Sequence, residues 1–276
     1  MDSPSPPRFN TRLRGRETLL GTVLTLPGVA LAELLAEPLD FVWIDLEHGA
    51  LDAGDVAPLS VAARAAGCAA LVRLASSDRV PAILDAGVDG VVAPRVESAA
   101  EARQLVDRLR HPPRGSRGFA ARRASAYGRA AAPAPGLPAA TSRDDAAARS
   151  SAADPLLFVQ IESAAGVEGA AEIAVVDGVD ALVVGCADLA LALGGTLEPA
   201  SPRVREAIAR VQGAAEAAGI ASGVAGPDDP ALLRELAGDR STLLVCAADV
   251  RIYARAVDDL VERLRAGERE VLRVGA

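Results

Sequence analysis

Two carboxylates follow apolar, β-branched segments of the chain. Glu162 ends the run Phe-Val-Gln-Ile-Glu, and Asp188 follows Gly-Cys-Ala at 185–187. If the two segments are adjacent parallel strands, these side chains converge at one edge, where two carboxylates with open positions beside them suit Mg²⁺ or Mn²⁺. The alternative is that each caps the following helix, since Asp188 precedes an apolar run and Glu162 precedes Ser163.

A histidine lies at the end of another apolar segment, in Asp-Leu-Glu-His-Gly at 45–49. Histidine exchanges protons near neutral pH, and Asp45 could fix the imidazole tautomer of His48, which makes the two a candidate acid/base dyad. A hydrogen-bonded surface histidine is the simpler alternative. The second histidine, His111, ends a helical segment before Pro-Pro, where a cation favours the helix C-terminus, so we expect a structural role for it.

An arginine, Arg73, interrupts the apolar run Ala-Leu-Val-Arg-Leu. A guanidinium on a buried parallel strand requires an anionic partner. That partner is either a protein carboxylate or the carboxylate of a bound substrate, and a position at the end of the strand favours the substrate.

Composition excludes several mechanisms. All 29 basic residues are arginine, so a Schiff-base aldolase, a pyridoxal-phosphate enzyme and a P-loop are excluded because each needs a lysine. The net charge of 29 − 37 = −8 over 276 residues argues against binding to nucleic acid or to an anionic membrane. We see neither a signal peptide nor a membrane span, and expect a cytoplasmic protein. The three cysteines have unrelated spacings and are expected to be buried hydrophobes.

The elements that must position these residues alternate regularly. Short apolar segments are separated by Ala/Leu-rich helical patterns, which predicts a single-domain (β/α)₈ TIM barrel over residues 17–276, with a doubly wound open sheet as the alternative. Residues 1–16 are expected to be flexible, 112–154 to form a long loop, and Val250 to Ala266 to form a final helix. The expected strands are Leu20 to Leu24, Phe41 to Leu46, Ala70 to Leu74, Gly90 to Ala93, Leu156 to Ile161, Ala181 to Gly185, Ile220 to Ala225 and Leu243 to Ala247.

Several motifs occur in the order found in one known family. The chain therefore resembles the HpcH/HpaI aldolases, which are class II pyruvate-dependent aldolases related to citrate lyase beta subunits. The resemblance runs from about Gly21 to Ala256. The motifs are Trp-Ile-Asp-Leu-Glu-His-Gly at 43–49, Val-Arg at 72–73, Leu-Asp-Ala-Gly at 84–87, Val-Ala-Pro at 92–94, Pro-Pro-Arg-Gly-Ser-Arg-Gly at 112–118, Val-Gln-Ile-Glu at 159–162 and Gly-Cys-Ala-Asp-Leu at 185–189.

This resemblance implies roles for particular residues. Glu162 and Asp188 would bind a divalent metal, with Mg²⁺ or Mn²⁺ expected and Co²⁺ or Zn²⁺ as alternatives. Gln160 and Ala187, together with Asp188, would help to bind pyruvate. Arg73 would stabilise its enolate. His48, beside Asp45, would be the acid/base, and Asp85 would support the histidine, either within one chain or across a subunit contact.

The reaction implied is reversible cleavage of a 4-hydroxy-2-oxo acid into pyruvate and an aldehyde. A lysine imine or a metal can stabilise the enolate, and without lysine only the metal route remains for this chemistry. Two other functions stay open: an acyl-CoA lyase like citrate lyase or malyl-CoA lyase, and a barrel that binds an oxo acid without turnover.

The chain departs from the family pattern at two residues and in one loop. Cys186 replaces a proline and Ala190 replaces a serine, while the loop after Tyr127, where the aldehyde half would be recognised, resembles nothing known to us.

The resemblance also implies a homo-oligomer, a hexamer built as a trimer of dimers. The amphipathic segment Val250 to Leu264 would then pack on a neighbour, although it could equally close its own barrel.

Overall fold

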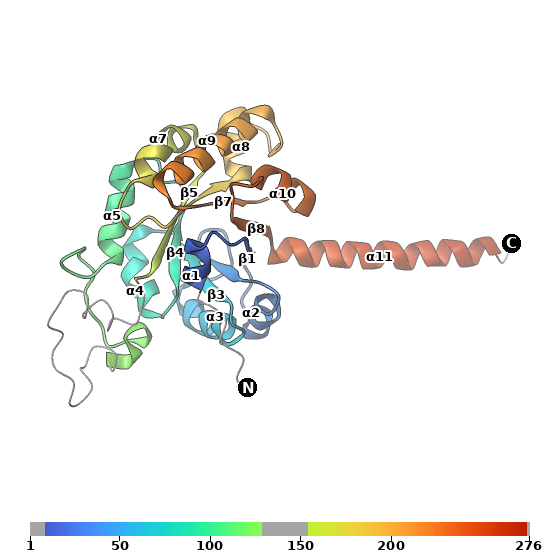
Figure 1. The fold of residues 1–276 in the computed structure, drawn as a ribbon. Helices are drawn as coiled ribbons and strands as arrows, with labels where there is room; N and C mark the ends of the chain where they lie inside the picture. Colours follow the sequence, from blue (N-terminus) through green and yellow to red (C-terminus); the bar gives the residue numbers. More distant parts are fainter. Residues whose placement is uncertain (1–8, 129–153, 275–276) are drawn as a thin grey trace, which may run out of the picture.

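The computed structural model describes residues 9–128 and 154–274. Within these residues, eight parallel strands close into a barrel in sequence order (Figure 1). The (β/α)₈ expectation is therefore confirmed, the open sheet is wrong, and each expected strand matches to within one residue at either end. The strands are β1 (Leu19–Leu24), β2 (Phe41–Asp45), β3 (Ala69–Arg73), β4 (Gly90–Ala93), β5 (Leu156–Ile161), β6 (Ala181–Gly185), β7 (Ala221–Ala225) and β8 (Leu243–Ala248).

Helices follow the strands and surround the barrel (Figure 1). Side-chain caps explain where several begin: Ser98 accepts a hydrogen bond from the backbone N–H of Glu101, and Ser163 does the same for Gly166. The helices are α1 (Phe9–Arg14), α2 (Val29–Ala36), α3 (Ala53–Ala65), α4 (Val80–Asp85), α5 (Ala99–Leu109), α7 (Ala164–Ala174), α8 (Cys186–Gly194), α9 (Pro202–Ala218), α10 (Pro230–Ala237) and α11 (Asp249–Val274), with 3₁₀ turns η1 (Ser77–Arg79) and η2 (Arg123–Gly128).

The core forms two shells because side chains of a strand alternate between its two faces. Val42 and Ile44 of β2 belong to the outer shell, packed among the helices. Phe41 and Trp43 of the same strand point into the barrel and pack with Phe158 of β5. The barrel interior is thus a filled apolar floor, and a cavity is possible only above it, at the carboxyl ends of the strands.

One helix was not expected from the sequence, and a second was expected only in the alternative in which Asp188 caps a helix. α1 lies within the segment expected to be flexible, but Leu13 is buried and the Phe9 ring packs on Phe41 with centroids 5.6 Å apart, so this helix covers the amino end of the barrel. α8 begins directly after β6, with Gly185 at its N-cap. Of the loop expected at 112–154, η2 is described and 129–153 lie outside the described residues.

The last helix, α11, begins at the barrel rim and projects away from the barrel (Figure 1). It does not fold back over its own barrel, which was one of the two possibilities for this segment. Val257, Leu260 and Leu264 on it are exposed. None of the helices described is both long and apolar enough to cross a membrane.

Candidate active site

The inward-facing positions of the strands change from apolar to polar toward their carboxyl ends. On β2 the side chains that face the barrel interior are, in order, Phe41, Trp43 and Asp45. On β5 they are Phe158 and Gln160. Glu162, the next residue with that orientation, lies just past the end of β5. The alternation of a strand therefore places the polar residues in one layer above the apolar floor.

Arg73 and Asp45 form a buried, two-point ion pair. The two residues are direct partners in the register of β2 and β3, with Arg73 Nε 2.9 Å from Asp45 Oδ1 and Nη2 2.6 Å from Oδ2. Burial alone would raise the pKa of Asp45, but the hydrogen bonds and charge of Arg73 outweigh it and leave that pKa below its usual value. Burial would likewise lower the pKa of Arg73, but Asp45 leaves it raised. The expectation that a substrate carboxylate is the partner of Arg73 is therefore corrected: the partner is a protein carboxylate.

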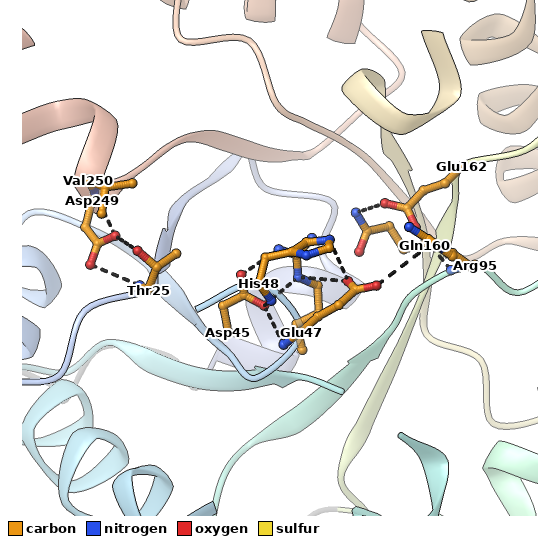
Figure 2. Close-up of polar contacts among 10 residues, drawn as sticks. Thr25, Asp45, Glu47, His48, Arg95, Gln160, Glu162, Asp249 and Val250 are labelled. Carbon is orange, nitrogen blue, oxygen red and sulfur yellow. Dashed lines mark hydrogen bonds and ion pairs between the residues drawn. The ribbon is translucent and has the colours of Figure 1, made fainter. Parts of the chain in front are cut away.

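The imidazole of His48 lies closest to a different carboxylate from the one expected. Asp45 Oδ1 accepts the backbone N–H groups of Glu47 and His48, not the ring. His48 Nε2 is 3.7 Å from Glu47 Oε2, and Arg73 Nε is 3.5 Å from the same oxygen (Figure 2). The Asp45–His48 dyad is thus replaced by a Glu47–His48 contact, and Asp45 acts on the loop backbone and on Arg73.

Glu162 is a buried carboxylate with neutral donors and negative neighbours. Its Oε1 accepts from Gln160 Nε2 at 2.6 Å and its Oε2 from the backbone N–H of Arg95 at 3.1 Å (Figure 2). Burial and the charges of Asp188 and Glu47 raise the pKa of Glu162 to about 7. A cation between Glu162 and Asp188 would oppose this shift, because a nearby positive charge favours the ionised carboxylate.

Glu47 and Arg95 also contact this site and were not among the residues expected there from the sequence. Glu47 is inside the Asp-Leu-Glu-His-Gly motif, so its type and place gave a signal. Arg95 contributes a backbone N–H, for which its side chain gives no signal. It directly follows the Pro at the end of β4 and has φ 54°, in the left-handed region that non-glycine residues rarely occupy.

Asp188 lies in the first turn of α8, and Ala187 precedes it on the same turn. The capping alternatives for the two carboxylates are wrong: Gly185 is the N-cap of α8, and Ser163, not Glu162, caps α7. Within the parts of the chain that the structure describes, no three His, Cys, Asp or Glu side chains group to hold a metal. The protein would therefore supply two carboxylates and leave the other positions open.

The residues around Glu162 and Asp188 fit a hard divalent ion. The donors are carboxylate oxygens, which Mg²⁺ and Mn²⁺ prefer. Gln160 Oε1 is buried with no hydrogen-bond partner among the described residues, so it is an acceptor that a bound group could satisfy. Gly185 has no side chain where a Cβ would lie 2.4 Å from Glu162 Oε1.

The glycine at 185 offers a direct test of this arrangement. Its φ of −84° suits alanine, so Gly185→Ala should act only by pushing Glu162 and Gln160 aside. We expect affinity for Mn²⁺, measured by calorimetry, to fall by about 10- to 100-fold. Gly213→Ala, in α9 where a Cβ meets nothing within 4 Å, is the matched control. Equal Mn²⁺ affinity in the two variants would contradict the placement of the ion at Glu162.

One cavity of about 510 Å³ contains nearly all of the expected site. Asp85 is the exception: it ends α4, accepts a hydrogen bond from Arg117 Nη2 at 3.0 Å, and does not line the cavity. Its support of His48 within one chain is not seen, and a role across a subunit contact stays a prediction. The expected residues that line the cavity are Asp45, His48, Arg73, Gln160, Glu162, Ala187 and Asp188.

The loop that carries His48 is held from the start of α11. The Asp249 carboxylate is fully buried and accepts the backbone N–H groups of Thr25 and Leu26 at 3.0 Å, as well as the Thr25 hydroxyl (Figure 2). The Thr25 carbonyl in turn accepts the N–H of Ala50 at 2.9 Å. A fixed Thr25 therefore fixes the backbone two residues after His48.

This chain of contacts makes Asp249 a positioning residue. In Asp249→Asn one oxygen becomes an NH₂ group that faces donors, which costs about 1 to 3 kcal/mol of stability. We expect kcat to fall while the KM for the oxo acid changes little, because the loop of His48 shifts and the metal carboxylates do not. Asp229→Ala, which removes the side-chain cap of α10 and costs about 1 kcal/mol, is a control for instability alone. Thr25→Ser should keep kcat, whereas Thr25→Val should lower it.

A closed barrel with a histidine, a buried arginine and two carboxylates at its carboxyl rim defines a class of protein, the barrel lyases and aldolases that act on oxo acids. Residues 29–237 match the family model described as HpcH/HpaI aldolase/citrate lyase. The chain belongs to this family, as its motifs indicated.

Known proteins resemble the chain over most of its length. It is 35% identical to the hydroxypyruvate/pyruvate aldolase of Paraburkholderia phytofirmans, covering 94% of this chain and 97% of that protein. It is 31% identical to a 4-hydroxy-2-oxovalerate aldolase of Novosphingobium aromaticivorans, covering 93% and 94%. A crystal structure of an HpcH/HpaI aldolase/citrate lyase family protein from Burkholderia cenocepacia J2315 is 34% identical, with a TM-score of 0.81 and coverage of 93% and 98%.

Proposed function

We propose that this protein is a class II, divalent-metal-dependent pyruvate aldolase. It reversibly cleaves a 4-hydroxy-2-oxo acid to pyruvate and an aldehyde. The observation that carries this proposal is that Glu162, Asp188, Arg73 and His48 line one cavity. The names of the relatives support it, since they are aldolases of pyruvate, hydroxypyruvate and 4-hydroxy-2-oxovalerate.

Glu162 and Asp188 would hold the ion, and Mg²⁺ or Mn²⁺ suits them best, with Co²⁺ or Zn²⁺ as alternatives. When bound, the ion supplies Lewis-acid stabilisation of the negative charge that develops on the substrate during cleavage. Gln160 and Ala187 orient the oxo acid beside these carboxylates. The raised pKa of Glu162, about 7, means that this carboxyl group must lose its proton before it serves as a ligand.

Arg73 stabilises the enolate oxygen with the part of its guanidinium that Asp45 leaves available. Asp45 accepts from Nε and Nη2, and Nη1 has no acceptor among the described residues. The two-point pair fixes the plane of the guanidinium, so that Nη1 is held in place before the charge develops.

His48 moves the proton, directly or through a water molecule. In cleavage it takes the proton of the C4 hydroxyl, the C3–C4 electron pair becomes the enolate of pyruvate, and the aldehyde leaves. Transfer of this proton from His48 to C3 of the enolate, directly or through the water molecule, then gives pyruvate and restores the neutral imidazole. In synthesis His48 returns the proton to the new hydroxyl oxygen. Glu47, 3.7 Å from Nε2, orients the ring.

Pyruvate release from 4-hydroxy-2-oxo acids, with and without EDTA, tests the proposal. We expect activity to vanish with EDTA, to return with Mg²⁺ or Mn²⁺, and to be lost in Glu162→Ala. Activity that EDTA does not change overturns the metal mechanism. Cleavage of a malyl-CoA or citryl-CoA thioester in preference to free acids identifies an acyl-CoA lyase instead, and binding of pyruvate without turnover of any acid identifies a non-catalytic barrel.

The exposed apolar residues of α11 support a homo-oligomer, with a hexamer built as a trimer of dimers as the expected form. Val257, Leu260 and Leu264 project on a helix that leaves its own barrel, and a neighbouring chain would cover them. Light scattering gives the mass directly. Asp85, which lies outside the cavity of its own chain, would act on His48 of a neighbour in such an assembly.

A further inference from the structure

The rim of the cavity carries a cluster of charged side chains to which the aldolase mechanism assigns no task. Arg251 and Asp228 both line the cavity. Arg251 lies on the first turn of α11, after β8, and Asp228 lies in the loop after β7. We propose that Arg251 binds the anionic end of the acceptor aldehyde, so that the enzyme prefers aldehydes that carry a carboxylate or phosphate. This inference rests on the proposed aldolase function and adds a substrate class to it.

The cluster holds Arg251 in a defined orientation. Arg251 Nε donates to Asp228 Oδ2 at 2.8 Å. Arg255, one turn further along α11, holds the same carboxylate, with Nη2 3.5 Å from Asp228 Oδ2 and Nη1 donating to the Asp228 carbonyl. Asp228 is therefore fixed from two sides, and its side chain is only 17% exposed.

The charge and the donors of the cluster favour an anion. Arg251 and Asp228 line the cavity and Arg255 lies behind Asp228, outside the lining; because Arg255 offsets the charge of Asp228, the three groups sum to one positive charge. Within the described residues, the two terminal Nη groups of Arg251 have no acceptor, and its side chain is 62% exposed. A guanidinium presents such paired N–H groups in the geometry that a carboxylate or phosphate matches with two oxygens.

The position of the cluster fits the acceptor and not the pyruvate half. Glu162 and Asp188 follow β5 and β6, and His48 follows β2. Going around the closed barrel from β6 through β7, β8 and β1 to β2, Arg251 lies between the metal carboxylates and the histidine. His48 must face the oxygen of the aldehyde, so a chain extending from that carbon along this side of the cavity reaches Arg251.

Arg73 is the other arginine that lines the cavity, among the residues that the structure describes. It has a different role from Arg251. Arg73 is buried and committed to Asp45, so it cannot also receive a distal anion. The cavity, of about 510 Å³, lies in the range of sites that bind molecules much larger than pyruvate. There is room for an acceptor that spans from His48 to the rim.

Paired acceptors measure the preference directly. With saturating pyruvate and Mg²⁺, the KM for 4-oxobutanoate is compared with that for the neutral 4-oxopentanal of equal length. Glyceraldehyde 3-phosphate and glyceraldehyde form a second pair, which separates phosphate from carboxylate recognition. In Arg251→Gln we expect the KM for the charged member of the preferred pair to rise at least about tenfold. The KM and the kcat for its neutral partner should each change less than about twofold.

Two further variants isolate the charge. Arg251→Lys should recover part of the lost affinity, because it keeps the charge and loses the paired geometry. Arg205→Gln removes an exposed arginine that pairs with Glu235 on the outer helices and should change nothing. An unchanged ratio of charged to neutral acceptors in Arg251→Gln overturns the proposal. A preference for hydroxylated neutral aldehydes that requires Asp228 also overturns it.

Failure of the aldolase function can be told apart from failure of this inference. Trp43 is the only tryptophan of the chain and lines the cavity, so its fluorescence reports on occupancy without turnover. If no aldehyde consumes pyruvate, the aldolase proposal fails. Even then, tighter binding of 4-oxobutanoate or glyceraldehyde 3-phosphate to the wild type than to Arg251→Gln supports the anion site, and equal binding of both overturns it.

Discussion

We expect Glu162→Gln to abolish aldol cleavage and, at the same time, to stabilise the metal-free protein. The loss of cleavage, about 1,000-fold or more in kcat/KM, follows because the variant removes one of the two carboxylates proposed to hold the metal. The gain in stability follows from the pKa of Glu162, about 7 in the folded chain against an ordinary value of 4.5. Folding that raises the pKa of a carboxyl group destabilises the protein wherever that group is ionised.

The pH dependence carries the sign of this effect. In EDTA the penalty from Glu162 is absent below about pH 4.5, grows as the pH rises toward 7, and is complete above 7. The Gln160 amide can turn its unpartnered Oε1 toward the new NH₂ group, so the variant avoids a contact between two donors. The glutamine variant should therefore be more stable than the wild type by about 1 to 3 kcal/mol at pH 8, and no more stable at pH 4.5. Thermal unfolding at the two pH values measures both.

Glu168→Gln, an exposed position of α7, is the control and should leave stability and activity unchanged. Excess Mn²⁺ should then stabilise the wild type and not Glu162→Gln, because a ligand stabilises only the state that binds it. If Glu162→Gln in EDTA is less stable than the wild type at pH 8, then burial and the negative neighbours of Glu162 do not destabilise the metal-free protein, and the prediction is wrong.

The second large effect is expected at the Arg73–Asp45 pair. Asp45→Asn leaves a buried guanidinium, 11% exposed, facing an amide, and such a loss costs about 3 to 5 kcal/mol. The single oxygen that the amide keeps must then serve both the guanidinium and the two backbone N–H groups of the His48 loop. We expect the variant to unfold at lower urea concentration and to lose at least about 100-fold in kcat, because Arg73 and His48 are both displaced.

A double variant separates stability from catalysis. Asp45→Val with Arg73→Met replaces the pair with apolar side chains and should recover most of the stability, as buried ion pairs often do when both partners are replaced. It should recover none of the activity. Glu235→Gln breaks an exposed pair with Arg205 and should cost less than about 1 kcal/mol. A loss in Asp45→Asn no larger than this would show that the buried pair does not hold the rim together.

The strands were predictable because each is a short apolar run bounded by turn residues, which is how parallel strands buried on both faces are encoded. α8 was missed because it follows β6 with no intervening turn: Gly185 is at once the last strand residue and the helix cap. α1 was missed because it is held by the packing of Phe9 on Phe41. This contact joins residues far apart in the sequence, so no local pattern predicts it.

For the site, residue types were predictable and their pairings were not. Asp45 and Arg73 were both identified, but their partnership depends on the register between β2 and β3, which no local pattern reveals. Asp45 was expected to contact the His48 ring because the two residues are three positions apart in the sequence. In the structure the Asp45 carboxylate accepts the backbone N–H of His48 instead. Arg95 enters through its backbone, so its side chain carried no information about Glu162.

Asp249 connects α11, which projects away from the barrel, to the loop that carries His48. The helix that it begins points outward, while its carboxylate holds Thr25 and, through Thr25, the backbone at Ala50. In the proposed homo-oligomer, a neighbour that fixes the direction of α11 would therefore act on the geometry around His48. Assembly and substrate binding would then be reciprocal: the free energy by which association strengthens binding would be the free energy by which substrate strengthens association.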